Sequence, residues 1–143
     1  MIRYMEIPEI NRVMEIWLQS NLDAHSFVDP SYWTDNYDLV KEMMENANIY
    51  VCEEDGIIQG FAGVMEGYYL AGIFVDKSMR SKGIGKQLLD YLKTRYDELT
   101  LDVFDQNPKA QSFYKREGFT TVESANNEET GHLEHTMVWP EKL

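Results

Sequence analysis

The order of apolar patterns along this chain limits its possible folds more than any other feature. Residues 49–53 and 57–65 have the apolar and β-branched character of strands, and only Glu54, Asp55 and Gly56 separate them. An Asp-Gly pair accepts the positive backbone angles of a tight hairpin turn. We therefore expect two antiparallel strands here, followed by a third strand over residues 69–75.

A helical pattern follows the third strand and changes the expected sheet. Apolar residues recur at helical spacing at Ile84, Leu88, Leu92 and Tyr96, and residues 99–103 resemble another strand. A helix that crosses over a sheet joins parallel strands, whereas a hairpin joins antiparallel ones. The predicted class is α/β (α+β), with N-terminal antiparallel strands that become parallel partway through the sheet.

The remaining elements follow from shorter patterns, and together with the crossover helix they give about four helices flanking the sheet. Pro8 favours a helix start, and Gly118 favours a helix end. The expected ranges are a strand at 2–7, helices at 8–21, 31–46 and 108–117, and strands at 120–124 and 133–139.

Length and composition predict one folded domain over residues 1–143. Hydrophobic residues make up 43% of the chain, which is too apolar for a disordered protein, and no proline-rich or serine-rich linker divides it. No run approaches the ~20 apolar residues of a membrane span, and the first eight residues include Arg3 and Glu6, so we expect a cytoplasmic protein. Cys52 lies in an apolar run and is expected to be a buried thiol.

A glycine-containing loop joins the third strand to the crossover helix. It covers residues 75–86 and places Gly83 and Gly85 where the helix begins. The first turn of a helix has unpaired N–H groups and the positive end of the helix dipole, so it attracts phosphate. Positive charge is available at Arg80, Lys82 and Lys86. Two glycines alone would also suit a plain helix start, so both interpretations stay open at this point.

Two familiar phosphate motifs do not fit this loop. A nucleotide P-loop needs a hydroxyl residue after its lysine, but Gln87 follows Lys86. A dinucleotide-binding fold would have a third glycine where Leu88 stands. The loop instead resembles the R-x-x-G-x-G signature of the GNAT acetyltransferase superfamily, and residues 107–119 resemble its N-x-x-A-x-x-F-Y-x-x-x-G-F element. The resemblance extends from about residue 49 to residue 119.

This resemblance implies a sheet splayed in its middle and acetyl-CoA as co-substrate. Backbone amides of the loop would hold the pyrophosphate with help from Arg80, and pantetheine would lie along the third strand. In the family a bulge in that strand directs an amide toward the thioester carbonyl, which is carried here to Phe74 and Val75. The implied cofactor-binding residues are Phe74, Val75, Arg80, Ser81, Lys82, Gly83, Ile84, Gly85, Lys86, Asn107 and Tyr114.

Acetyl transfer to an amine needs a proton donor for the leaving thiolate and an acceptor for the amine proton. Tyr114 matches the tyrosine of the family, and a phenol of reference pKa ~10 stays protonated at neutral pH. A core aromatic beside Phe113 is the alternative. Asp102 lies where several protein-acetylating relatives carry a glutamate, and it is either the base, directly or through a water, or an outward-facing strand residue. Glu66 is the next candidate base.

The three histidines show no metal-ligand pattern. His132 and His135 are three residues apart in an expected strand, so they point to opposite faces, and His25 lies alone in a loop. We predict no metal ion and assign the histidines no role.

Acidic residues concentrate in the half of the chain that lines the acceptor side in this superfamily. Residues 1–76 carry 14 acidic and 3 basic side chains, which is a net charge of −11 out of −12. A cationic primary amine, such as a lysine side chain, a protein N-terminus or a polyamine, would be attracted there. The small size of the chain and the placement of Asp102 favour a protein or peptide amine. An acidic surface that serves only solubility would look the same. Such charge disfavours nucleic acid as a partner, and no membrane partner is expected.

The expected activity is acetyl-CoA-dependent N-acetyl transfer, with three alternatives left open. The acceptor could be a small molecule, such as a polyamine or an aminoglycoside. The chain could bind acyl-CoA as a sensor without turnover. It could also be an interaction protein with a vestigial pocket. A monomer and a homodimer are both compatible with the sequence.

Overall fold

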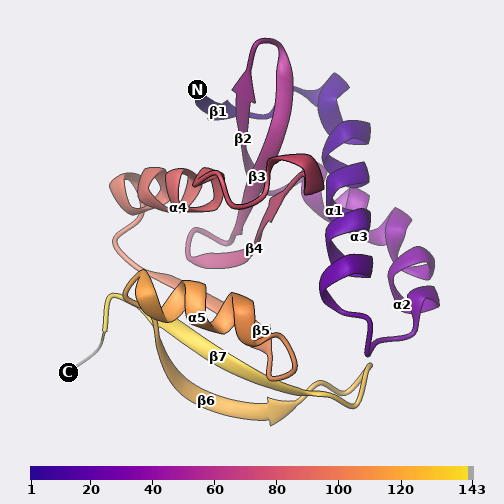
Figure 1. Cartoon of the computed structure of the whole chain (residues 1–143), viewed down its shortest axis with the longest axis vertical. Helices are drawn as coiled ribbons and strands as arrows, with labels where there is room; N and C mark the ends of the chain where they lie inside the picture. Colours follow the sequence, from indigo (N-terminus) through magenta and orange to yellow (C-terminus); the bar gives the residue numbers. More distant parts are fainter. Residues whose placement is uncertain (142–143) are drawn as a thin grey trace.

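The computed structural model describes residues 1–141, whose strands form one mixed sheet in the order β1-β2-β3-β4-β5-β7-β6 (Figure 1). The strands are Ile2–Tyr4 (β1), Asn48–Glu54 (β2), Ile57–Met65 (β3), Tyr69–Val75 (β4), Leu99–Phe104 (β5), Thr120–Asn126 (β6) and Leu133–Trp139 (β7). The helices are Ile10–Ala24 (α1), Pro30–Asp35 (α2), Tyr37–Glu45 (α3), Ile84–Arg95 (α4) and Pro108–Arg116 (α5), with short 3-10 turns at Ile7–Glu9 (η1) and Lys77–Met79 (η2). None of the helices in residues 1–141 combines the length and apolar character needed to cross a membrane.

The first four strands are antiparallel, as their hairpin signals predict. Asp55 and Gly56 in the β2–β3 turn both have positive φ, 53° and 78°, which are the angles that the Asp-Gly pair was expected to supply. The α4 crossover then makes β4 and β5 parallel, and this prediction is also confirmed. Beyond β5 the sheet becomes antiparallel again through β7 and β6.

Strands β4 and β5 separate almost as soon as they meet. They share the single register pair Tyr69 and Thr100, after which β4 (Leu70 to Val75) and β5 (Leu101 to Phe104) diverge. We call this region the split. Figure 1 shows the two halves of the sheet that it divides, β1–β4 above and β5–β7 below. The expected splay in the middle of the sheet is therefore present.

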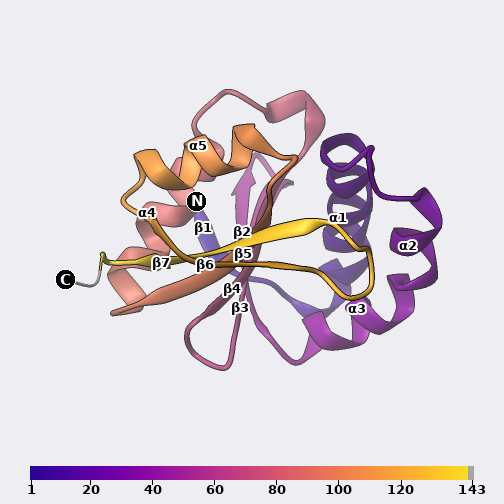
Figure 2. The same ribbon diagram turned by 90° about the horizontal axis from the view of Figure 1, so that it is seen from below.

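Helices cover both faces of the sheet, and each face has its own apolar cluster. Helices α4 and α5 lie on one side and α1 to α3 on the other (Figure 2). Alternation along β2 shows the division, because Tyr50 and Cys52 face the cluster under α4 and α5 while Ile49 and Val51 face the cluster under α1 to α3. Cys52 is 1% exposed, which confirms the expected buried thiol.

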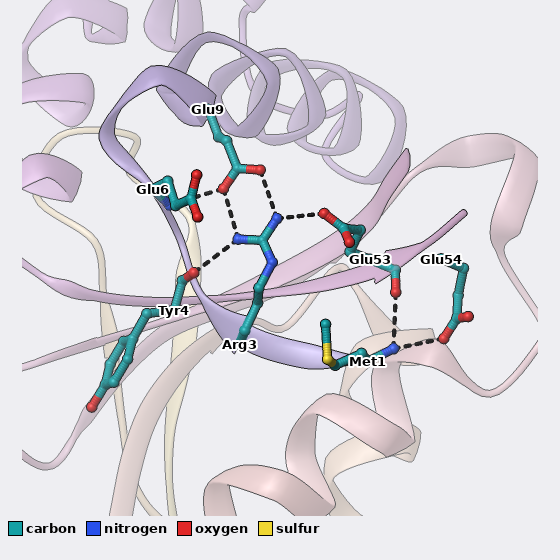
Figure 3. Close-up of polar contacts among 7 residues, drawn as sticks. All are labelled: Met1, Arg3, Tyr4, Glu6, Glu9, Glu53 and Glu54. Atoms are coloured by element: carbon teal, nitrogen blue, oxygen red, sulfur yellow. Dashed lines mark hydrogen bonds and ion pairs between the residues drawn. The ribbon is translucent and has the colours of Figure 1, made fainter. Parts of the chain in front are cut away.

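The N-terminal edge of the sheet is fixed by one arginine (Figure 3). Arg3 on β1 donates to both carboxylate oxygens of Glu9, at 2.9 and 2.7 Å, and to Glu53 on β2. These bonds lower the pKa of the Glu9 carboxyl. The Met1 amine also bonds the Glu53 carbonyl and the Glu54 carboxylate. Strand β1 is thus attached to β2 and to the turn before α1.

The main error of the sequence-based prediction is the helix expected over residues 31–46. The structure divides it into α2 and α3 at Asn36, so five α-helices flank the sheet in residues 1–141. The Asn36 side chain donates to the Tyr32 carbonyl at 2.7 Å, and the Asn36 backbone has φ −94° and ψ 2°. A short amide side chain competes in this way with the helical backbone hydrogen bonds. The α1 helix also starts later, at Ile10, and ends later, at Ala24, than expected.

Candidate active site

The edge of β4 that faces the split is the central feature of the site. After Tyr69 this edge pairs with no strand in residues 1–141. A bulge lies within β4, because Leu70 pairs with Val64 and Gly72 pairs with Gly63, which leaves Ala71 as the extra residue. The bulge expected in this strand is therefore present, and it lies before Phe74 and Val75, the residues to which the amide role was carried. Free backbone groups of β4 are available to a ligand that runs along the split.

The start of α4 has the backbone geometry on which the expected anion site depends. Gly83 is the N-cap with φ 81°, and Ser81 has φ 65°, so the chain makes a left-handed turn into the helix. The backbone N–H groups of Ile84, Gly85 and Lys86 come before the first helical hydrogen bond, from Gln87 to Gly83, and need other acceptors. A Cβ on Gly83 would meet nothing within 4 Å, so this glycine is required for its backbone angle rather than for space.

The loop before α4 is held by Asp76, which the sequence reasoning missed. Its carboxylate accepts from the Ser78 amide at 2.9 Å and the Ser78 hydroxyl at 2.6 Å, and from Arg12 on α1 at 2.8 Å. These bonds lower the pKa of Asp76 to about 2. The Asp-x-Ser pattern could have indicated this cap, because Asp side chains commonly bond the amide two residues on.

The three basic side chains near the loop differ in their surroundings. Arg80 contacts the Asp23 carboxylate and the Val75 carbonyl, each at 3.4 Å. Lys86 is paired with Asp90 at 3.1 Å and Glu117 at 3.3 Å, so its ammonium group faces α4 and the end of α5. Lys82 is exposed. Arg80 and Lys82 are thus the better placed sources of positive charge for an anion at the α4 start.

Tyr114 on α5 is buried, with 8% of its surface exposed, in the cluster under α4 and α5. Burial raises the pKa of its phenol, and the backbone N–H of Ile73 on β4 offsets part of this rise. The neighbouring Phe113 lies against Gly85 of α4, where a Cβ would be 3.6 Å from its ring. A protonated phenol therefore faces a backbone amide of β4 at the split.

Asp102 lies on the opposite face of the sheet from Tyr114. Its neighbours Leu101 and Val103 face the α4 and α5 side, so by alternation Asp102 faces the side of α1 to α3. It is exposed, and its two carboxylate oxygens accept from the hydroxyls of Tyr69 at 2.8 Å and Thr136 at 2.6 Å. Burial and the Asp102 charge raise the pKa of Tyr69, which keeps that phenol protonated.

Two further carboxylates, Glu134 and Glu66, lie in different places relative to Asp102. Glu134 lies two residues from Thr136 on the same face of β7, and burial, with a contribution from the charge of Asp102, raises its pKa. Glu66 lies instead in the β3–β4 turn with φ 56°, where it lines a hollow against α3 together with Met43 and Met65. The structure therefore groups Glu134 with Asp102 and places Glu66 in a different environment.

The sequence suggested that His25 lies alone in a loop, but in the structure its ring has polar partners on both sides. Its ring contacts the Asn21 amide oxygen and the Asn107 amide nitrogen, both at 3.1 Å. The Asn107 side chain also caps α5 by accepting from the Ala110 amide at 3.2 Å. Both polar atoms of the Asn107 amide are thus engaged within the protein. Phe104 lies 4.9 Å from the imidazole, between ring centroids.

Comparison with known proteins shows the family of this chain. Residues 23–140 match the sequence model of the acetyltransferase (GNAT) domain. The chain belongs to the GNAT family. It is an acetyltransferase, and GNAT enzymes take the acetyl group from acetyl-CoA.

Two similar GNAT proteins come from Escherichia coli (strain K12). The chain is 38% identical to the peptidyl-lysine N-acetyltransferase YiaC, over 98% of this chain and 97% of that protein. It is 30% identical to the peptidyl-lysine N-acetyltransferase YjaB, over 91% of this chain and 88% of that protein. The solution structure of apo-form YjaB from Escherichia coli superposes with a TM-score of 0.84, at 26% identity, over 97% of this chain and 96% of that chain.

Most of the contacts that the sequence did not reveal join GNAT elements far apart in the chain. Tyr69 and Asp102 are 33 residues apart, and His25 and Asn107 are 82 apart. No local spacing signals such pairs. The glycine loop and Tyr114, by contrast, belong to continuous motifs and were found from the sequence.

Proposed function

We propose that this enzyme transfers the acetyl group of acetyl-CoA to the side-chain amine of a lysine in a protein or peptide, with residues 1–143 acting as one catalytic domain. The observation that carries the choice of acceptor is the near full-length match to YiaC and YjaB, both named peptidyl-lysine N-acetyltransferases. The net charge of −11 over residues 1–76 supports it, because a cationic amine is attracted to an acidic surface.

The coenzyme site in this proposal consists mainly of backbone. N–H groups from Lys82 to Lys86 bind the pyrophosphate, and the left-handed backbone at Ser81 and Gly83 shapes the loop. The Arg80 guanidinium exchanges its contact with Asp23 for one with the pyrophosphate. Around Phe74 and Val75, the backbone groups of β4 that do not pair with β3 bind the pantetheine amides like an added strand. The proposed contact of Asn107 with the coenzyme chain would come in addition to its cap of α5.

The chemistry needs groups on both faces of the split. A backbone N–H of β4 at the split can stabilise the negative charge that develops on the thioester carbonyl oxygen. Tyr114 donates its proton to the sulfur as the carbon–sulfur bond breaks. Asp102, on the other face, takes the proton that the attacking nitrogen loses when the new carbon–nitrogen bond forms, directly or through a water. Its position opposite Tyr114 favours Asp102 over Glu66 as the base.

The decisive experiment measures thiol release from acetyl-CoA with a lysine peptide as acceptor. We expect release with that peptide and an added acetyl group on its lysine by mass spectrometry. The matched control is the same peptide with its lysine already acetylated and its N-terminus free. Release with the control peptide at the same rate, or only with a polyamine or an aminoglycoside, would contradict lysine as the acceptor.

A further inference from the structure

One imidazole joins the two halves of the split sheet. His25 follows α1, which packs on β3 and β4, and Asn107 precedes α5, which packs on β5. The contact between His25 Nε2 and Asn107 Nδ2, at 3.1 Å, therefore spans the region where β4 and β5 no longer pair. On the other side of the ring, Nδ1 contacts Asn21 Oδ1 at 3.1 Å.

The hydrogen bonds around this ring determine where its proton lies. Asn107 Oδ1 accepts from the Ala110 amide, so the group that meets His25 is the NH₂ of Asn107, which can only donate. His25 Nε2 must therefore accept, and the ring proton lies on Nδ1, which donates to Asn21 Oδ1. The Asn21 NH₂ in turn donates to the Trp17 carbonyl at 3.0 Å. The contacts form one chain from α1 to α5, and each contact joins a donor to an acceptor.

Aromatic side chains enclose the ring and keep it neutral. Phe104 on β5 and Trp33 on α2 lie 4.9 and 5.5 Å from the imidazole, between ring centroids. Phe27, two residues after His25, also contacts Phe104 and reaches His132 at the start of the last strand. Burial lowers the pKa of His25 to about 4. At neutral pH the imidazole is therefore uncharged, as the hydrogen-bond chain requires.

We propose that His25 is a positioning residue for acetyl transfer, which fixes the N-terminal end of α5 relative to β4 and so holds the Tyr114 phenol beside the Ile73 amide. Tyr114 lies two helical turns after Asn107, so a shift at the start of α5 moves the phenol with the helix. The proposal rests on the proton-donor role of Tyr114 given above.

Two substitutions at one position separate positioning from packing. His25→Phe keeps an aromatic ring and removes both polar contacts, whereas His25→Gln keeps one donor and one acceptor. We expect the kcat of His25→Phe to fall about tenfold with little change in KM for acetyl-CoA, because a small misplacement of a reacting group is costly. His25→Gln should recover most of that loss. Equal kcat in the wild type and His25→Phe, or no recovery in His25→Gln, would overturn the proposal.

His135→Phe is the matched control. It also removes an imidazole with two polar contacts, to Ser124 at 2.7 Å and Asp105 at 2.7 Å, but all three residues belong to the C-terminal half of the sheet. We expect its kcat to stay close to that of the wild type. A loss as large as that of His25→Phe would show that any such histidine matters, and the positioning role would be rejected.

A double-mutant cycle with Tyr114→Phe distinguishes failure of this proposal from failure of the proposed function. If His25 acts through Tyr114, adding His25→Phe to Tyr114→Phe should lower kcat by less than about twofold. Additive losses would overturn the positioning role even if Tyr114 is the donor. Full activity of Tyr114→Phe alone would overturn the donor role, and the positioning role that depends on it.

The tautomer of His25 gives a test that does not depend on activity. ¹⁵N NMR of the imidazole should show a protonated Nδ1 and an unprotonated Nε2 at neutral pH. A protonated Nε2 could not accept from Asn107 and would remove the bridge on which the proposal stands.

Discussion

The two faces of the split are built by different means. On the face of α4 and α5, the proposed anion site consists of backbone N–H groups whose direction is set by left-handed turns at Ser81 and Gly83. On the face of α1 to α3, the polar groups near the split are side chains. Examples are Asp102, hydrogen-bonded to Tyr69, and His25, hydrogen-bonded to Asn107. In the proposed function the first arrangement serves any acetyl acceptor, because it binds the coenzyme and does not contact the acceptor. The second can be changed residue by residue, which suits the side that selects an acceptor.

The largest effect is expected from removing the proposed proton donor, Tyr114, from the face of α4 and α5. Tyr114→Phe should lower kcat about 10²-fold, because a positioned acid contributes this much to transfer. Acetyl-CoA affinity, measured by calorimetry, should change by less than about twofold, since the ring still fills its place in the core. Tyr68→Phe, which alters a tyrosine that is 42% exposed, is the control and should keep its rate. Equal losses in both variants would remove Tyr114 from the mechanism.

Acid should weaken the face of α1 to α3 before it weakens the loop that precedes α4. The folded-state pKa of His25 is lowered to about 4 from 6.5, so the unfolded chain binds more protons between these values and stability falls as pH drops through this window. Asp76, with its pKa lowered to about 2 from 3.8, supports the loop until the pH falls below about 4.

The contribution of His25 to the pH dependence of stability can be measured by urea unfolding of the wild type and His25→Gln from pH 6.5 to pH 4. The wild type should lose about 2 kcal/mol more of its unfolding free energy than the variant, a figure reduced for the partial exposure of the ring. Parallel pH profiles would show that His25 does not titrate in this way and that its surroundings are wetter than the structure indicates.

A matched pair of glycines tests whether the coenzyme face depends on backbone shape. Gly83 has φ 81° and Gly56 has φ 78°, and a Cβ on either would meet nothing within 4 Å. Each substitution to alanine should therefore cost about 1 kcal/mol of stability through the same left-handed strain. Only Gly83→Ala should also weaken acetyl-CoA binding, by about tenfold, because only it distorts the amides at the α4 start. Equal acetyl-CoA affinities in the two variants would show that coenzyme binding does not depend on the backbone shape of this loop.

The contrast between the faces also explains how much the sequence could predict. The Asp55–Gly56 hairpin, the α4 crossover and the Gly83 loop follow from local rules, since the residues that form each one are neighbours in the chain. The bonds from Tyr69 to Asp102 and from His25 to Asn107 depend on how the folded halves meet, and no spacing within the sequence encodes them. The break at Asn36 belongs to the same class, because a side chain there competes with a helix that propensity alone would continue.

The smallest effect is expected where the two faces touch, at the ion pair between Asp23 and Arg80. The pair is 3.4 Å apart and one third exposed on each side, so its contribution to stability should be below about 1 kcal/mol. Asp23→Asn should nevertheless strengthen acetyl-CoA binding about threefold, because the Arg80 guanidinium is then free to turn to the pyrophosphate. Asp90→Asn removes the same charge from the exposed Lys86 pair and should leave the affinity unchanged. Equal gains in both variants would assign the effect to net charge, whereas a gain confined to Asp23→Asn would show that an acidic residue of the acceptor face restrains the coenzyme site.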